Sequence, residues 1–157
     1  MTLYLIRHAT ADAHGLPGGD FVRSLIPKGI KQAHRVGTFL CENDLIPDLV
    51  LTSPVLRAKK TAEVLTEAGC PAPVVEAWLS CGMRPETALQ ELSAYRELNS
   101  VAIVGHEPDF SGLVEHFLGA SFYSIRVKKT SVISLEIDPP RPKGLLNFSI
   151  PCKYLPE

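Results

Sequence analysis

Two arginines and two histidines stand where short apolar runs of this sequence end. Arg7 and His8 follow the first run, Arg57 comes shortly after the second, and His106 follows a later one. The planar fork of a guanidinium matches a phosphate or a carboxylate. An imidazole can act as nucleophile, base or acid near neutral pH. These residue types together predict chemistry on an oxyanion.

The apolar runs predict the elements that must position these side chains. A short apolar run bounded by polar residues is typical of a buried strand, and ligands bind outside the carboxyl ends of the strands in open α/β sheets. Strand patterns alternate with helical patterns, and a final pair of strands is expected to extend the sheet at one edge. Strands are expected at residues 3–6, 48–52, 73–76, 100–104, 130–137 and 145–150, and helices at 27–42, 54–68, 85–95 and 108–118.

The helix at 54–68 is expected to place Arg57. Ser53 is the predicted N-cap and Pro54 the predicted first-turn residue. Arg57 then lies in the first turn, where a cation is unfavourable against the helix dipole. A cation that accepts this cost is expected to face an anion, which the free N–H groups of the helix end also favour.

The helix at 27–42 begins with Pro27, whose missing N–H costs nothing at a first helical position. Five residues recur at helical spacing and predict its buried face. They are Ile30, Ala33, Gly37, Leu40 and Cys41.

A long loop, residues 10–26, separates the first strand from this helix. A loop of this length in a compact domain is often functional. It carries Asp20 and Arg23, which are either a solvated ion pair of little energetic value or contacts to the same site.

Composition excludes several classes of protein. The chain has 157 residues, enough for a single domain over 1–157, and 45% of them are hydrophobic. Its net charge of −1 argues against a nucleic-acid partner, which normally meets a basic patch. There is no apolar run of membrane-spanning length and no signal-peptide pattern, so we expect a cytoplasmic protein without a membrane partner.

The four cysteines do not predict a metal site. Cys41, Cys70, Cys81 and Cys152 form no Cys-x-x-Cys pair, so structural zinc is not expected. In the cytoplasm they are expected to be reduced and to serve as small, buried apolar side chains.

The four site residues suit phosphoryl transfer through a phosphorylated histidine. A neutral nitrogen of His8 attacks phosphorus, while Arg7 and Arg57 bind the equatorial oxygens and stabilise the charge that develops there. His106 can donate a hydrogen bond to the same group. The two arginines also penalise protonation of His8, which keeps it nucleophilic. No metal or other cofactor is needed, because the arginines neutralise the charge.

Three segments resemble one known family. Leu5-Ile6-Arg7-His8-Ala9, the stretch from Thr52 to Ala62 and Val104-Gly105-His106-Glu107-Pro108 are similar to the histidine phosphatase (phosphoglycerate mutase-like) superfamily. The chain length, the turn at 79–82 and residues 20–29 resemble its small branch, the SixA-type protein phosphohistidine phosphatases.

The resemblance implies both a fold and a set of roles. The implied fold is a three-layer α/β arrangement with a mostly parallel central sheet flanked by helices and no cap domain. The implied roles make His8 the phosphorylated residue and place Arg7, Arg57 and His106 in the phosphate pocket. Arg23 is implied as a further contact.

Two departures from the family pattern affect the expected chemistry. The glycine that usually follows the histidine is Ala9 here, and larger members carry a glutamate general acid where this chain has Leu79-Ser80-Cys81. Asp20 and Glu107 are candidate substitutes for that acid. A missing acid suits the imidazole leaving group of phosphohistidine better than an alkoxide, which must be protonated.

Several functions remain open at this point. The first is hydrolysis of phosphohistidine on a phosphorylated protein partner. The second is a phosphatase for a small phosphomonoester. A non-catalytic phosphate-binding module would not need both His8 and His106, and a histidine-based metal hydrolase lacks the expected ligand pattern.

Overall fold

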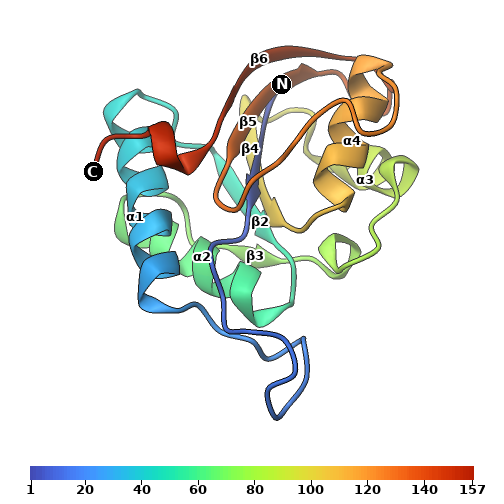
Figure 1. Ribbon diagram of the computed structural model, residues 1–157. Coiled ribbons are helices and arrows are strands. Elements are labelled where there is room, and N and C mark those ends of the chain that lie inside the picture. Colours follow the sequence, from blue (N-terminus) through green and yellow to red (C-terminus); the bar gives the residue numbers. More distant parts are fainter.

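The computed structural model describes all 157 residues and shows a six-stranded sheet between two layers of helices (Figure 1). The strand order is β3-β2-β4-β1-β5-β6. The strands are β1 (Thr2–Arg7), β2 (Leu49–Thr52), β3 (Val74–Val75), β4 (Ser100–Gly105), β5 (Val132–Ile137) and β6 (Gly144–Ile150). The helices are α1 (Pro27–Glu42), α2 (Leu56–Glu67), α3 (Pro85–Leu92) and α4 (Asp109–Leu118).

The sheet is mostly parallel, as the sequence predicts. Strand β4 pairs in parallel with β1 and β2, and β2 pairs in parallel with β3. Strands β5 and β6 form an antiparallel pair that extends the sheet beyond β1, so the expected edge extension is confirmed. Only α3 and a short 3₁₀ turn lie between Gly82 and β4, and no cap domain covers the sheet edge.

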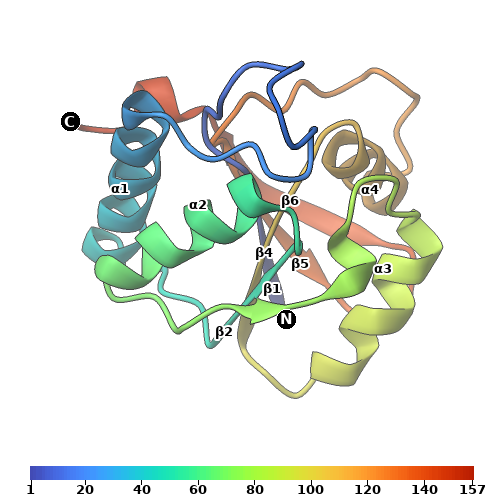
Figure 2. The ribbon, with the colours of Figure 1, turned by 90° about the horizontal axis from the view of Figure 1, so that it is seen from below.

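Two hydrophobic cores lie on opposite faces of the sheet. Successive side chains of a strand point to opposite faces, so Leu3 and Leu5 of β1 enter one core while Tyr4 and Ile6 enter the other. The first core is closed by α3 and α4 and the second by α1 and α2. Figure 2 shows the two helix pairs on either side of the sheet. The three-layer arrangement is therefore confirmed.

Helix α1 has its predicted bounds and most of its predicted buried face. Ala33, Gly37 and Leu40 are buried as predicted. The prediction is wrong for Ile30, which is 41% exposed, and for Cys41, which is also exposed. A Cβ atom at Gly37 would lie 2.6 Å from the Cβ of Ala68, so this glycine allows α1 to approach the end of α2 closely.

Helix α2 begins later than predicted, and the expected N-cap is wrong. The N-cap residue is Val55, and no side chain caps the helix. Ser53 lies before the helix, where its Oγ accepts a hydrogen bond from the Val55 N–H at 3.2 Å. Arg57 does lie in the first turn, as predicted.

Helix α4 ends at Leu118, and its C-cap is Gly119, which has the left-handed φ of 62° that favours glycine. None of the four helices combines the length and the apolar character needed to cross a membrane.

Candidate active site

Strands β1 and β4 bring the two histidines together. They are parallel neighbours in which Arg7 pairs with Gly105, so His8 and His106 both come directly after the paired strand ends. The two imidazole ring centroids lie 5.3 Å apart. Parallel strands deliver their carboxyl ends to one edge of a sheet, which is why residues so far apart in sequence meet there.

The hydrogen bonds of His8 fix its tautomer. The Nε of Arg57 lies 3.2 Å from His8 Nε2, and His8 Nδ1 lies 2.8 Å from the carbonyl oxygen of Ala9. A guanidinium can only donate, so Nε2 accepts and carries no proton. Nδ1–H therefore donates to the Ala9 carbonyl. The lone pair of Nε2 then faces the arginine, as a nucleophile directed at an arginine-bound anion must.

His8 is neutral at any physiological pH. Burial is the largest cause that lowers its pKa from 6.5 to about 3. The hydrogen bond to Ala9 raises the pKa, while His106, Arg57 and Arg7 lower it further. The sequence argument credited the arginines alone. Desolvation of the ring is in fact larger, because the folded chain buries His8 almost completely.

His106 is held by a serine from the neighbouring strand end. Its Nε2 lies 2.7 Å from Ser53 Oγ, which also accepts the Val55 N–H. The Ser53 hydroxyl proton can therefore donate to Nε2, and in that tautomer the imidazole proton resides on Nδ1. Burial first, then Arg57 and Arg7, lower the pKa of His106 to about 4, although Asp20 raises it. A neutral His106 with a proton on Nδ1 is a hydrogen-bond donor.

Two buried donors at this site have no partner. They are His106 Nδ1 and Arg7 Nε. The other end of the Arg7 guanidinium donates from Nη1 to the Val127 carbonyl at 2.8 Å, which fixes the side chain. An unsatisfied buried donor costs about 1–3 kcal/mol, so paired unsatisfied donors in one place are expected where a ligand supplies the acceptors. An anion with several oxygens fits both.

A hollow of about 400 Å³ contains these groups. All seven residues that the sequence nominated line it, and so do four that it did not nominate for the site. The full lining is Arg7, His8, Ala11, His14, Asp20, Arg23, Arg57, Cys81, His106, Glu107 and Lys129. The dilysine at 128–129 just before a strand was a signal that sequence reasoning could have used. No sequence signal pointed to Ser53 as the partner of His106.

Asp20 and Arg23 form more than a surface ion pair. Asp20 Oδ1 lies 2.8 Å from Arg23 Nε, and Asp20 Oδ2 lies 3.2 Å from Arg57 Nη2. Arg57 Nη1 also donates to the Asp20 backbone carbonyl at 3.0 Å. Burial raises the pKa of Asp20, but Arg57 and Arg23 outweigh burial and leave the pKa below its ordinary value. Asp20 is therefore an ionised counter-charge to Arg57 at neutral pH.

Glu107 accepts two hydrogen bonds from Ser111 in the first turn of α4. Its Oε1 accepts the Ser111 backbone N–H at 2.7 Å and its Oε2 accepts the Ser111 hydroxyl at 2.9 Å. Both contacts hold the first turn of α4, so this carboxylate is occupied although it lines the hollow.

Cys81 lines the hollow next to Arg57. Its Sγ lies 3.7 Å from Arg57 Nη2. Burial raises the pKa of the thiol and outweighs the opposing effect of Arg57. All four cysteines are free; Cys70 and Cys152 are buried as expected, but Cys41 and Cys81 are exposed, so the expectation is wrong for these two. No three His, Cys, Asp or Glu side chains gather into a group that could hold a metal ion.

The two lowered histidine pKa values predict a pH-dependent stability. Between about pH 4 and pH 6.5 the unfolded chain binds protons at these imidazoles that the folded chain does not. The free energy of unfolding should therefore fall as the pH falls through this window, by about 2 kcal/mol per histidine at pH 5. Urea unfolding at pH 7 and pH 5 measures the change. His8→Asn should remove roughly half of this contribution, and an unchanged pH dependence in that variant would contradict the assignment.

Comparisons with known proteins place this chain in a family. Residues 3–79 match the family model of the histidine phosphatase superfamily (branch 1). An uncharacterized protein of Picosynechococcus sp. is 32% identical over 143 residues, which cover 86% of this chain and 84% of the relative.

Solved structures share the fold over almost the whole chain. The protein histidine phosphatase SixA, complexed with tungstate, has a TM-score of 0.88 at 22% identity, with 98% of each chain covered. A proposed SixA phosphohistidine phosphatase from Agrobacterium tumefaciens has a TM-score of 0.82 at 23% identity and covers 96% of this chain and 97% of its own. The alpha-ribazole phosphatase from Shigella flexneri has a TM-score of 0.76 at 23% identity, with 94% and 95% covered.

The family model matches residues 3–79, which contain the first two motifs. The Picosynechococcus relative is similar over most of the length of this chain, and the fold agrees over nearly all of it. The chain therefore belongs to the histidine phosphatase superfamily and is a phosphatase.

Proposed function

We propose that a single domain spanning residues 1–157 hydrolyses phosphohistidine carried by a partner protein, through a phosphohistidine formed on His8. The observation that carries the proposal is the unprotonated His8 Nε2 beside two unpartnered buried donors, Arg7 Nε and His106 Nδ1. A nucleophile and its oxyanion donors in one hollow are the parts that phosphoryl transfer requires.

In the first step the lone pair of His8 Nε2 forms a bond to phosphorus. The bond between phosphorus and the leaving group breaks, and its electron pair departs with that group. Arg57 turns its guanidinium from Nε2 to the phosphoryl oxygens, which Arg7 and His106 also bind. In the second step water attacks phosphorus, the P–N bond to His8 breaks, and inorganic phosphate leaves with Nε2 again unprotonated.

The state of the carboxyl groups supports a nitrogen leaving group. Asp20 has a lowered pKa, and both oxygens of Glu107 are bound to Ser111. Asp20 therefore has no proton to donate at neutral pH, and the hydrogen bonds of Glu107 are made to the first turn of α4. An alkoxide leaving group needs a proton donor, whereas the imidazole of phosphohistidine departs with less help. The SixA-type fold is consistent with this substrate class.

A comparison of substrates tests the proposal. At pH 7 a phosphohistidine protein should have a kcat/KM far above that of any alkyl phosphomonoester, measured with one enzyme preparation. A sugar phosphate or phosphoglycerate that is better by tenfold, about 1.4 kcal/mol, would contradict the proposal. That result would favour a small-molecule phosphatase, the alternative for which the alpha-ribazole phosphatase fold is the precedent.

Replacement of Asp20 tests whether its carboxylate is a counter-charge that competes with phosphate for Arg57. Its carboxylate lies 3.2 Å from Arg57 Nη2 and competes with phosphate for that guanidinium. Asp20→Asn should therefore tighten inhibition by inorganic phosphate several-fold, on the order of 1 kcal/mol for a partly exposed ion pair. Asp12→Asn, in the same loop, is the matched control. Weaker phosphate inhibition in Asp20→Asn would show instead that Asp20 is needed to position Arg57.

A further inference from the structure

A cationic trough leads from the catalytic hollow along α1. A second hollow of about 400 Å³ shares Arg7 and Lys129 with the catalytic one. A third hollow, of about 510 Å³, shares Lys28, Gln32 and Lys153 with the second. Because the second hollow shares wall residues with each of the other two, it adjoins both. We call the second and third hollows together the cationic trough.

The trough concentrates positive charge on a protein whose net charge is only −1. Neither of its two hollows is lined by an aspartate or a glutamate. None of its basic side chains takes part in any ion pair of the protein. These side chains are Arg7, Lys28, Lys31, Arg35, Lys128, Lys129 and Lys153.

This arrangement is electrostatically unfavourable in the free protein. Lys28 and Lys31 stand near the N-terminus of α1, the positive end of the helix dipole, and the first turn has no acidic residue. Burial lowers the pKa of Lys129, and Arg7, Arg23, Lys28 and Arg57 lower it further. The folded chain thus holds like charges together without counter-charges, as expected where a binding partner supplies the negative charge.

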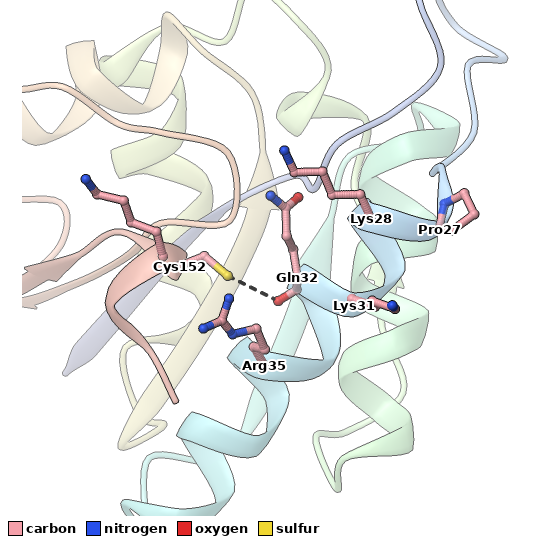
Figure 3. A pocket seen from close by; sticks show the side chains of 7 residues that line it. Pro27, Lys28, Lys31, Gln32, Arg35 and Cys152 are labelled. Atoms are coloured by element: carbon pink, nitrogen blue, oxygen red, sulfur yellow. Dashed lines mark hydrogen bonds between the residues drawn. The ribbon is translucent and has the colours of Figure 1, made fainter. Parts of the chain in front are cut away.

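The trough is built between two fixed segments. Figure 3 shows Lys28, Gln32 and Arg35 on α1 beside the segment that carries Cys152. Cys152 Sγ contacts the Gln32 carbonyl at 3.6 Å, and Arg35 Nε donates to the Pro156 carbonyl at 3.0 Å. These contacts hold the C-terminal segment against α1. The positions of the surrounding lysines are therefore set by the fold.

We propose that the cationic trough docks an acidic surface of the protein that carries the phosphohistidine. This inference rests on the proposed function, because the docked partner is the proposed substrate. The trough lies next to the catalytic hollow, with which it shares Arg7 and Lys129. Complementary charge at such a surface raises the association rate and selects the partner.

The shape and lining of the trough favour a protein over other polyanions. No aromatic side chain lines either hollow, so the trough lacks the platforms on which single-stranded nucleic acids stack their bases. The trough is also concave, whereas a lipid bilayer presents a flat surface. Its combined volume far exceeds what a second phosphate group would fill.

Two variants with the same change in charge test the trough. Lys28→Glu with Lys153→Glu reverses two cations that line both trough hollows and do not line the catalytic one. Arg96→Glu with Lys143→Glu reverses two cations that line none of the three hollows. Circular dichroism and thermal unfolding check that both variants fold.

Two phosphohistidine peptides serve as probes, one flanked by aspartates and one by asparagines at the same positions. The wild type and the Arg96/Lys143 variant should prefer the acidic peptide at least tenfold in kcat/KM at low salt, and the preference should decline as salt is added. The Lys28/Lys153 variant should lose the preference. The ratio of kcat/KM for the two peptides is insensitive to any change in the chemical step that affects both peptides equally. No preference in the wild type, or a preference kept in the Lys28/Lys153 variant, would overturn the proposal.

Binding of the unphosphorylated peptides, followed by fluorescence anisotropy, separates docking from hydrolysis. Preferential binding of the acidic peptide without hydrolysis of either phosphopeptide would overturn the proposed function and leave the trough as a docking surface. Equal binding of both peptides would overturn the proposal that the trough docks an acidic surface. A single-stranded oligonucleotide or phosphatidylserine vesicles that bind tenfold tighter than the acidic peptide would also overturn it.

Discussion

Replacing His8 with asparagine is expected to abolish turnover while the fold survives. The side chain that remains has no basic nitrogen to attack phosphorus, so a reaction that passes through a covalent intermediate loses its first step. We expect a fall in kcat of at least about a thousandfold, as for other removed nucleophiles. Steady-state release of phosphate from a phosphohistidine protein measures this.

The His8→Asn result is interpretable only if the variant folds. His8 is buried, so its circular dichroism spectrum and thermal unfolding need comparison with the wild type. Binding of inorganic phosphate provides a second control, because Arg7, Arg57 and His106 remain. A folded His8→Asn protein with kcat within tenfold of the wild type would refute the role given to His8.

Replacing Arg57 is expected to have the second largest effect. Its guanidinium contacts His8 Nε2 at 3.2 Å, and the side chain is buried in the first turn of α2. Loss of one preorganised donor to a developing oxyanion costs about 10²- to 10³-fold, or 2.7–4 kcal/mol. We expect Arg57→Ala to lose at least this much in kcat/KM. Arg57→Lys should recover only part of it, because lysine keeps the charge but not the planar pair of donors.

Lys60→Ala is the matched control for Arg57, since it removes a cation from the same helix. Lys60 is exposed and pairs with Glu63 at 2.7 Å. Its removal should change kcat/KM by less than twofold. An Arg57→Ala variant that stays within tenfold of the wild type would mean that phosphate is held mainly by other groups.

The positions of the elements could be predicted because local signals specify them. Pro27 marks the start of α1, Gly119 marks the end of α4, and apolar runs mark the central strands. The convergence of His8 and His106 also followed from sequence, because both come directly after strands that were expected to be parallel. Local sequence patterns and the geometry of parallel sheets are together enough to predict that such residues meet at one edge of the sheet.

The details of the site depend on contacts between distant segments, and local patterns do not report these. Ser53 looked like a helix cap, but His106, from another strand end, bonds its hydroxyl at 2.7 Å. For Asp20 and Arg23 the sequence left open a solvated ion pair or contacts to the site, and the fold decides between them by placing Arg57 3.2 Å from Asp20. Lys129 enters the hollow because the segment before β5 passes β1, where the Thr130 N–H bonds the Arg7 carbonyl at 3.0 Å.

The buried face of α1 shows the same limit. Helical spacing placed Ile30 and Cys41 on one face with Ala33, Gly37 and Leu40, but only the last three are buried. The close approach of Gly37 to Ala68 fixes which part of that face lies against α2. Sequence spacing can predict that a helix is amphipathic, but the neighbour that it meets decides its orientation.

The central claim, that phosphate passes through His8, is tested most directly by trapping it there. A ³²P-labelled phosphohistidine protein is mixed with excess enzyme, quenched in alkali within a single turnover, and the enzyme is digested and mapped. The account predicts an acid-labile, alkali-stable label on the peptide that contains His8, formed as the substrate loses phosphate and absent from the His8→Asn variant. Release of inorganic phosphate without any enzyme-bound label at intermediate times, or a label on another residue, would contradict it.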